Sequence, residues 1–94
     1  MDDKTTAFYA RLKDELANST LWPSEYLYKF IVPSDTNKVL EVQKAFDNMG
    51  AVIKTNTSKT GKFTSLSVNV RMKSPQHVID KYIEVSHIEG IVSL

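Results

Sequence analysis

Residues 56–70, NTSKTGKFTSLSVNV, hold the residue types in this chain that most resemble a functional site. The tripeptide Thr60-Gly61-Lys62 resembles the end of a phosphate-binding loop, which requires G-x-x-x-x-G-K-[ST] between a strand and a helix. Here Asn56 stands at the place of the first glycine, and Phe63 stands at the place of the Ser/Thr. The residues that follow alternate as in a strand, so no helix N-terminus is available to hold a phosphate. The segment therefore predicts a hairpin turn around Gly61.

The same strand also resembles the face with which RNA-recognition modules bind single-stranded RNA. Those modules stack bases on exposed aromatic side chains of two central strands. Phe63 lies where one such aromatic is expected, but Ser65 occupies the next expected place. The neighbouring predicted strand presents Leu27, Lys29 and Ile31 on that face. A net charge of +1 gives the molecule no field that favours nucleic acid, so RNA binding stays an alternative. A local basic rim could come from Lys54, Lys59, Lys62, Arg71 and Lys73.

Four polar residues recur at steps of three and four in the last predicted helix: His77, Asp80, Glu84 and His87. The two histidines are about 15 Å apart along a helix axis at roughly 1.5 Å per residue, so they cannot share one metal ion. Ser65 and Ser67 belong to no motif that ties them to a catalytic base. The sequence thus predicts no catalytic residue, no metal site and no cofactor, and we expect that the protein is not an enzyme.

The composition is that of one ordinary domain. The chain has 94 residues, of which 41% are hydrophobic and 24% charged, and it has no cysteine. The absence of cysteine removes disulfides and thiolate chemistry and is compatible with a reducing compartment. The N-terminal residues form no signal-peptide core, and no apolar run approaches the length of a membrane span. We therefore expect a cytoplasmic protein with no membrane partner.

Apolar periodicity predicts helices over residues 3–18, 33–50 and from Ser74-Pro75 to Gly90, and strands over 26–32, 51–57, 62–72 and 91–94. In the first helix, Phe8, Leu12 and Leu16 recur at four-residue steps. In the first long strand, the core face is predicted to hold Tyr26, Tyr28, Phe30 and Val32. In the second long strand, it is predicted to hold Leu66, Val68, Val70 and Met72.

After the first helix, the order strand–helix–strand–strand–helix–strand is that of a ferredoxin-like βαββαβ fold. Right-handed crossovers place both helices on one face of a four-stranded antiparallel sheet, with the first and third strands in its centre. The fold class is therefore α+β, a two-layer sandwich with an extra N-terminal helix. We expect one domain over residues 1–94, in which 1–21 form the helix and a connector and 22–94 form the core.

The sheet face away from the two helices carries Leu27, Ile31 and Phe63 among polar neighbours. Such a face is more apolar than a bare surface and more polar than a core. One possible cover is the N-terminal helix, folded back with Phe8, Leu12 and Leu16 and helped by Trp22. The other is a partner protein, most simply a second copy of the chain. The sequence leaves both possibilities open.

These residues together resemble a known family. The pattern Ser58-Lys59-x-Gly61-Lys62-Phe63-x-Ser65-Leu66-Ser67-Val68 and the preceding Trp22-Pro23 are similar to the YbeD-like family of small uncharacterised bacterial proteins, over residues 22–94. The resemblance implies a fold similar to that of the ACT regulatory domains, which bind amino acids in metabolic enzymes. By that analogy it also implies a small-ligand sensor at the loop after the first strand, which holds Asp35 and is followed by Val39-Leu40.

Our first hypothesis is a non-enzymatic regulatory or protein-interaction domain. It would bind a protein partner, or a second copy, through the open sheet face or through the loop between the first strand and the following helix. Phe63 would be the apolar anchor, and Ser65, Ser67, Asn69 and Arg71 would be the donors that orient the partner. Lys59 and Lys62 would contribute at the hairpin turn. The alternatives are single-stranded RNA binding on the same face and the small-ligand sensor.

Overall fold

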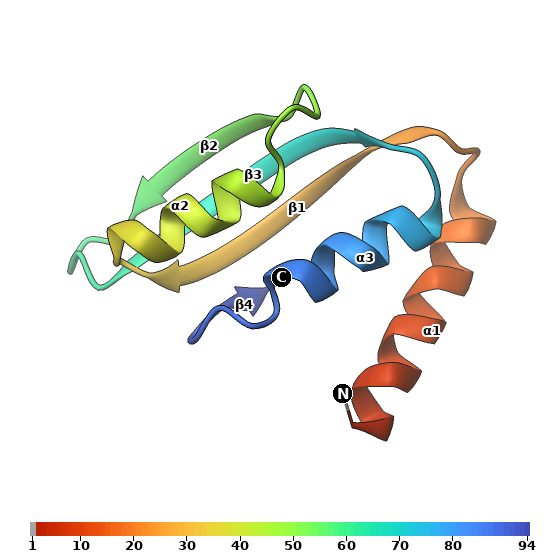
Figure 1. Ribbon diagram of the computed structural model, residues 1–94, viewed down its shortest axis with the longest axis horizontal. Coiled ribbons are helices and arrows are strands. Elements are labelled where there is room, and N and C mark those ends of the chain that lie inside the picture. The colour runs from red at the N-terminus through yellow and green to blue at the C-terminus, as the bar shows by residue number, and fades with distance from the viewer. Residues whose placement is uncertain (1) are drawn as a thin grey trace.

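The computed structural model describes residues 2–94. Within that range the helices are α1 (Asp3–Ser19), α2 (Thr36–Ala45) and α3 (Pro75–Val85). The strands are β1 (Ser24–Pro33), β2 (Val52–Thr57), β3 (Phe63–Met72) and β4 (Val92–Ser93). The predicted order of elements is confirmed, and Figure 1 follows it from α1 to the short final strand.

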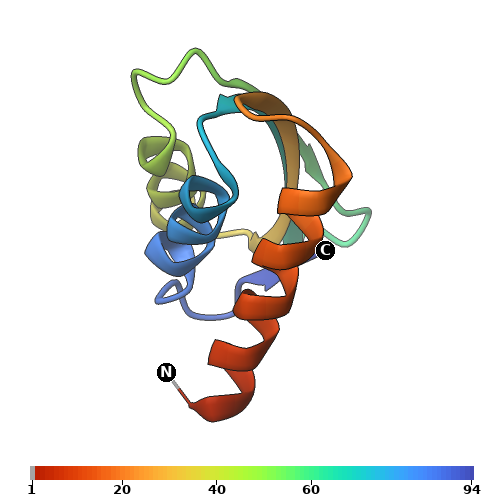
Figure 2. The same cartoon turned by 90° about the vertical axis from the view of Figure 1, so that its right-hand side faces the viewer.

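The strands form one antiparallel sheet in the order β2-β3-β1-β4, and α2 and α3 lie on the same face of it (Figures 1 and 2). This is the predicted ferredoxin-like sandwich. The central strands pair along their whole length, from Ser24 opposite Met72 to Pro33 opposite Phe63. β2 accompanies β3 only as far as Asn69. β4 pairs with β1 at two positions, so both central strands extend beyond their outer neighbours.

The core lies between the sheet and the two helices, and it follows the parity of the strands. From β1 and β3 it takes the buried side chains of Tyr28, Phe30, Val32, Leu66, Val68, Val70 and Met72. From α3 it takes Val78, Ile79, Tyr82 and Val85. Both predicted faces are confirmed, although Tyr26 is only partly buried. These apolar side chains fix which face of β3 is left for other purposes, because neighbouring residues of a strand point to opposite sides.

Local signals in the sequence set the ends of the helices. Ser74 caps α3 by accepting a hydrogen bond of 3.1 Å from the backbone N–H of His77, and Pro75 begins the helix as predicted. α2 ends at Ala45, earlier than the predicted stop at Gly50. After Ala45 the α-helical hydrogen bonds give way to tighter, 3₁₀-type bonds. The N–H groups of Phe46 and Asp47 donate to the carbonyls three residues before them.

The first helix, α1, lies along the flank of α3 rather than across the sheet (Figure 2). The ring of Tyr9 stacks on that of Tyr82 with centroids 6.5 Å apart, and the indole N–H of Trp22 donates to the carbonyl of Leu16 over 3.0 Å. The predicted position of Phe8 in the packed stripe is wrong, because its side chain is 53% exposed and Tyr9 takes its place. The possibility that α1 covers the open sheet face is also wrong.

Candidate functional site

The sheet surface turned away from α2 and α3, here called the open face, is made of cross-strand rows. Partners in an antiparallel register share a face, so the pairing places each row directly. From the α3 end towards the hairpin the rows are Glu25–Arg71, then Leu27–Asn69–Val52, then Lys29–Ser67–Lys54, then Val92–Ile31–Ser65–Asn56, then Pro33–Phe63. The open face is thus built by all four strands.

Apolar side chains lie in two groups, here called the apolar ends, one on each side of the middle of the open face. Leu27 is 51% exposed and Val52 is 60% exposed, on either side of Asn69. Towards the hairpin, Phe63 is 49% exposed and Val92 is 50% exposed. These side chains would lose contact with water if another surface lay on the sheet, and the hydrophobic effect would favour that contact.

A pair of lysines crosses the middle of the open face. Lys29 and Lys54 stand on either side of Ser67, and both side chains are exposed. Within residues 2–94 neither lysine forms an ion pair. The open face therefore combines a positively charged centre with apolar ends.

The predicted site residues of β3 do share this face. Phe63 borders a shallow hollow of about 150 Å³ together with Ile31 and Ser65. The Ser65 hydroxyl is occupied, since it donates to the carbonyl of Asn56 over 3.2 Å. Ser67 is half-buried and Asn69 is exposed.

The three cationic residues of the predicted site are not together. The ten residues of β3 span about 30 Å at roughly 3.3 Å per residue, with Lys59 and Lys62 before one end and Arg71 near the other. Alternation within a strand could not predict that Lys29 and Lys54 lie in one row. Only the register of β1 and β2 against β3 brings the two lysines together.

The stretch that resembled a phosphate loop is the turn between β2 and β3. Gly61 has φ 76°, and its N–H donates to the carbonyl of Ser58 over 2.9 Å. The Ser58 N–H donates to the carbonyl of Phe63 over 2.8 Å, which closes the hairpin. A strand follows, so the prediction of a hairpin turn is confirmed.

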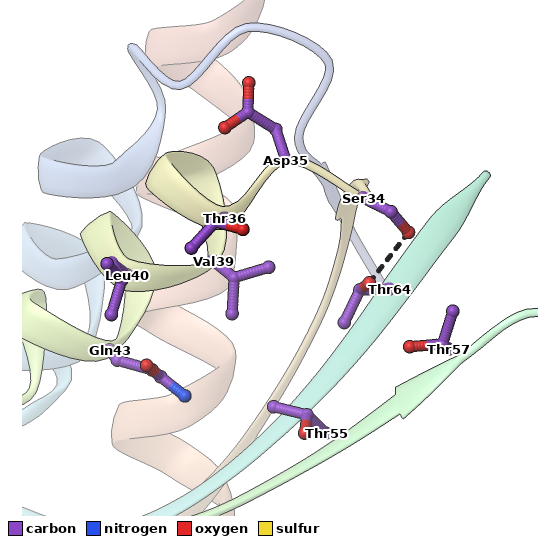
Figure 3. A pocket seen from close by; sticks show the side chains of 9 residues that line it. All are labelled: Ser34, Asp35, Thr36, Val39, Leu40, Gln43, Thr55, Thr57 and Thr64. Atoms are coloured by element: carbon purple, nitrogen blue, oxygen red, sulfur yellow. Dashed lines mark hydrogen bonds between the residues drawn. The ribbon is translucent and has the colours of Figure 1, made fainter. Parts of the chain in front are cut away.

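A groove of about 340 Å³ lies where the loop after β1 enters α2 (Figure 3). The helix packs mainly against β1 and α3, which leaves the helix-facing side of β2 open. At the strand side of the groove, the hydroxyls of Ser34 and Thr64 are hydrogen-bonded at 2.9 Å (Figure 3). The other side chains that line the groove are Asp35, Thr36, Val39, Leu40, Gln43, Thr55 and Thr57.

The histidines of α3 and its following turn have separate partners. His77 Nδ1 accepts the backbone N–H of Lys73 over 3.1 Å, and His87 Nε2 lies 2.9 Å from Glu41 Oε2. Residues 2–94 bring together no group of three or more side chains that could ligate a metal ion. None of the helices described combines the length and apolar character that a membrane span requires.

Comparison with known proteins shows where the chain belongs. The model of the family described as "Protein of unknown function (DUF493)" matches residues 18–94. The solution structure of protein HP0495 from H. pylori is similar, with a TM-score of 0.65 and 21% sequence identity, over 87% of this chain and 92% of that one. At that identity the likeness concerns the fold alone. No curated protein matches the chain. The resemblance inferred from the residues is thus confirmed, and the chain belongs to the DUF493 family, the YbeD-like proteins.

Proposed function

We propose that this chain is a non-enzymatic interaction domain of the cytoplasm, which binds a protein with an acidic surface through the open face. One observation carries the proposal: the open face is uncovered and places Lys29 and Lys54 between apolar ends. Complementary charge steers and orients a partner, and the apolar ends supply the hydrophobic contribution. A regulatory role would follow if that partner were an enzyme.

The same charges argue against a second copy as the occupant. In a symmetric dimer each partner presents the same patch, so the lysine row of one copy would face or flank that of the other. Like charges placed together in an interface are costly. The opposite charge must then come from a different protein.

Nucleic acid fits the face less well than an acidic protein. Among the described residues 2–94, β1 and β3 present one aromatic side chain on the open face, that of Phe63. Tyr26, Tyr28 and Phe30 point to the helical side. Stacking on aromatic rings is the main sequence-tolerant contribution to single-strand binding, so one ring at the margin offers a weak platform.

The test is capture from native lysate with three forms of the protein. The first is the wild type, the second is Lys29→Glu plus Lys54→Glu, and the third is Lys4→Glu plus Lys13→Glu. The third form makes the same charge change on exposed residues of α1, away from the open face. We expect the wild type and the α1 variant to retain a partner that the open-face variant loses. The purified partner should bind the wild type more weakly as salt is raised.

Three outcomes would overturn the proposal. The first is a partner retained by the open-face variant, and the second is a wild type that forms a dimer through this face. The third is tight binding of mixed oligonucleotides by the wild type at low salt, with steep loss as salt rises, which would instead support RNA binding.

The groove beside α2 favours a second candidate, a small-ligand sensor. Its support is the gathering of hydroxyl groups from the loop, α2, β2 and β3 around Asp35 and the apolar Val39 and Leu40 (Figure 3). Amino acids and nucleotides should raise the thermal midpoint if one of them binds the folded chain. The shift should vanish in Thr57→Val, which removes a groove hydroxyl, and persist in Thr60→Val at the hairpin. A screen without any shift would remove this candidate.

A further inference from the structure

A hollow of about 440 Å³ lies at the end of β3 that is opposite the hairpin, where β3 extends beyond β2. Three separate segments surround it. They are the turn between α2 and β2, the end of β3, and the first turns of α3. The hollow belongs neither to the rows of the open face nor to the groove beside α2, although Arg71 lies at its border with the open face.

Positive charge gathers in this hollow. Arg71, Lys73 and Lys81 line it together with one carboxylate, that of Asp47. Outside the lining, Glu25 stands opposite Arg71 in the register of β1 with β3, and Glu84 forms an ion pair with Lys81. Within residues 2–94 neither Arg71 nor Lys73 forms an ion pair. Because the whole chain carries a net charge of only +1, this is a local concentration of cations and not a reflection of the average surface.

Two of the lining side chains are held in place by the fold. The ammonium group of Lys81 donates to the carbonyl of Ala45 over 2.6 Å and to Glu84 Oε1 over 3.0 Å, so its position is fixed between the two helices. The ring of His77 accepts the N–H of Lys73 at Nδ1 over 3.1 Å. A neutral imidazole with an acceptor at Nδ1 carries its proton on Nε2, so His77 is a hydrogen-bond donor at its other nitrogen.

We infer that this hollow binds a phosphate group carried by a small molecule. A guanidinium, two ammonium groups and an imidazole N–H supply donors from several directions, which suits a tetrahedral anion with several acceptor oxygens. The hollow is larger than a phosphate requires. The remainder of a small molecule can therefore lie beside Met49, which is the apolar part of the lining.

The experiment titrates the full chain with inorganic phosphate, pyrophosphate and ribose 5-phosphate while amide NMR signals are recorded. We expect saturable shifts at residues 47–49 and 71–77, with the organic phosphate bound more tightly than inorganic phosphate. In Arg71→Gln plus Lys73→Gln the dissociation constant should rise by at least about tenfold, since hydrogen bonds to charged groups are lost. Both substituted residues are exposed, so the thermal midpoint should stay within a few degrees.

The matched control is Lys59→Gln plus Lys62→Gln, which removes the same charge at the hairpin and should keep the affinity of the wild type. If the control lost as much affinity for the phosphate probes, the binding would be unspecific attraction to positive charge, and the inference would be overturned. Shifts spread over the whole surface, or no shifts with any of the three probes, would also overturn it. Inorganic phosphate bound as tightly as ribose 5-phosphate would show an anion site that does not recognise a carrier molecule. That result would contradict the second half of the inference.

Discussion

Three tyrosine side chains, Tyr26, Tyr28 and Tyr82, meet between β1 and α3. Their ring centroids are 4.7 to 6.2 Å apart. The Tyr28 hydroxyl donates to the carbonyl of Val78 over 3.1 Å, and those of Tyr26 and Tyr82 are hydrogen-bonded at 2.8 Å. Burial raises the pKa of Tyr28 and of Tyr82 above the ordinary phenol value, and their phenol neighbours add to the effect. The core thus requires that the phenols of Tyr28 and Tyr82 keep their protons.

A pH-dependent loss of stability follows for the wild type. A raised pKa in the folded state means that the stabilisation is complete below about pH 10 and is lost above it, because the unfolded tyrosines then release protons first. Each buried tyrosine should lower the free energy of unfolding by about 1.4 kcal/mol per pH unit in that range. Urea unfolding at pH 7 and from pH 9 to pH 11.5 measures this slope.

The variant Tyr28→Phe isolates one of these phenols. At pH 7 it should be less stable than the wild type by about 1 kcal/mol, because the hydrogen bond to Val78 is lost. Above pH 10 the difference should shrink, since the variant has one fewer phenol to titrate. A difference that stays constant up to pH 11.5 would contradict the raised pKa of Tyr28.

At the scale of elements, β3 serves two sides of the sheet at once. Its even-numbered residues from Thr64 to Met72 are buried under the helices, and its odd-numbered residues from Phe63 to Arg71 face the open side. The two sets of side chains lie on opposite sides of the sheet, because neighbouring residues of a pleated strand point in opposite directions. Substitutions at neighbouring positions should therefore have different consequences.

The pair Leu66→Ala and Ser67→Ala tests that separation. Leu66 is 1% exposed, and its truncation should lower the free energy of unfolding by about 2–5 kcal/mol through lost contacts and a cavity. Ser67→Ala, one residue further, should change it by no more than about 0.5 kcal/mol. Urea unfolding of both variants gives the comparison, and equal losses would show that the open side is part of the core.

At the scale of the whole molecule, the helices leave one broad side of the sheet bare (Figure 2). α1 stabilises the flank of α3 through Tyr9, Leu12 and Leu16, none of which is fully buried. The family match begins at residue 18, after most of this helix. The rest of the domain has its own continuous core without it.

A chain that starts at Asn18 should therefore keep the fold of residues 18–94. It should be less stable by a few kcal/mol at most, because three partly buried side chains are lost. Sedimentation equilibrium should give the monomer mass for both chains, since α1 does not shield the open face and its lysine row opposes self-pairing. A dimer that forms only in the shorter chain would mean that α1 covers an interface.

The sequence predicted most of the fold, because its strongest signals are local. Alternation identified the faces of β1 and β3, and Ser74-Pro75 identified the start of α3. The position of α1 was not predictable in this way, because Phe8, Tyr9, Leu12 and Leu16 give two overlapping stripes. Tertiary contact with Tyr82 selects the stripe that contains Tyr9.

The candidate sites were predictable only in part, for a related reason. The predicted apolar and serine residues of the open face follow from parity within β1 and β3. The lysine row and the cationic hollow depend on which residues of other segments lie beside β3. Lys29 and Lys54 are 25 residues apart, and only the register places both beside Ser67. Local periodicity carries no information about such pairings.

The pairing of β1 with β3 also has a consequence for the newly made chain. Pro33 ends β1, yet Met72, which pairs with its first residue, is synthesised 39 residues later. At about 5–20 residues per second, β1 is without its main neighbour for about 2–8 seconds. During that interval Tyr28, Phe30 and Val32 have no core to enter. The sheet therefore cannot form from the N-terminal half of the chain alone, because its central pair requires residues 63–72.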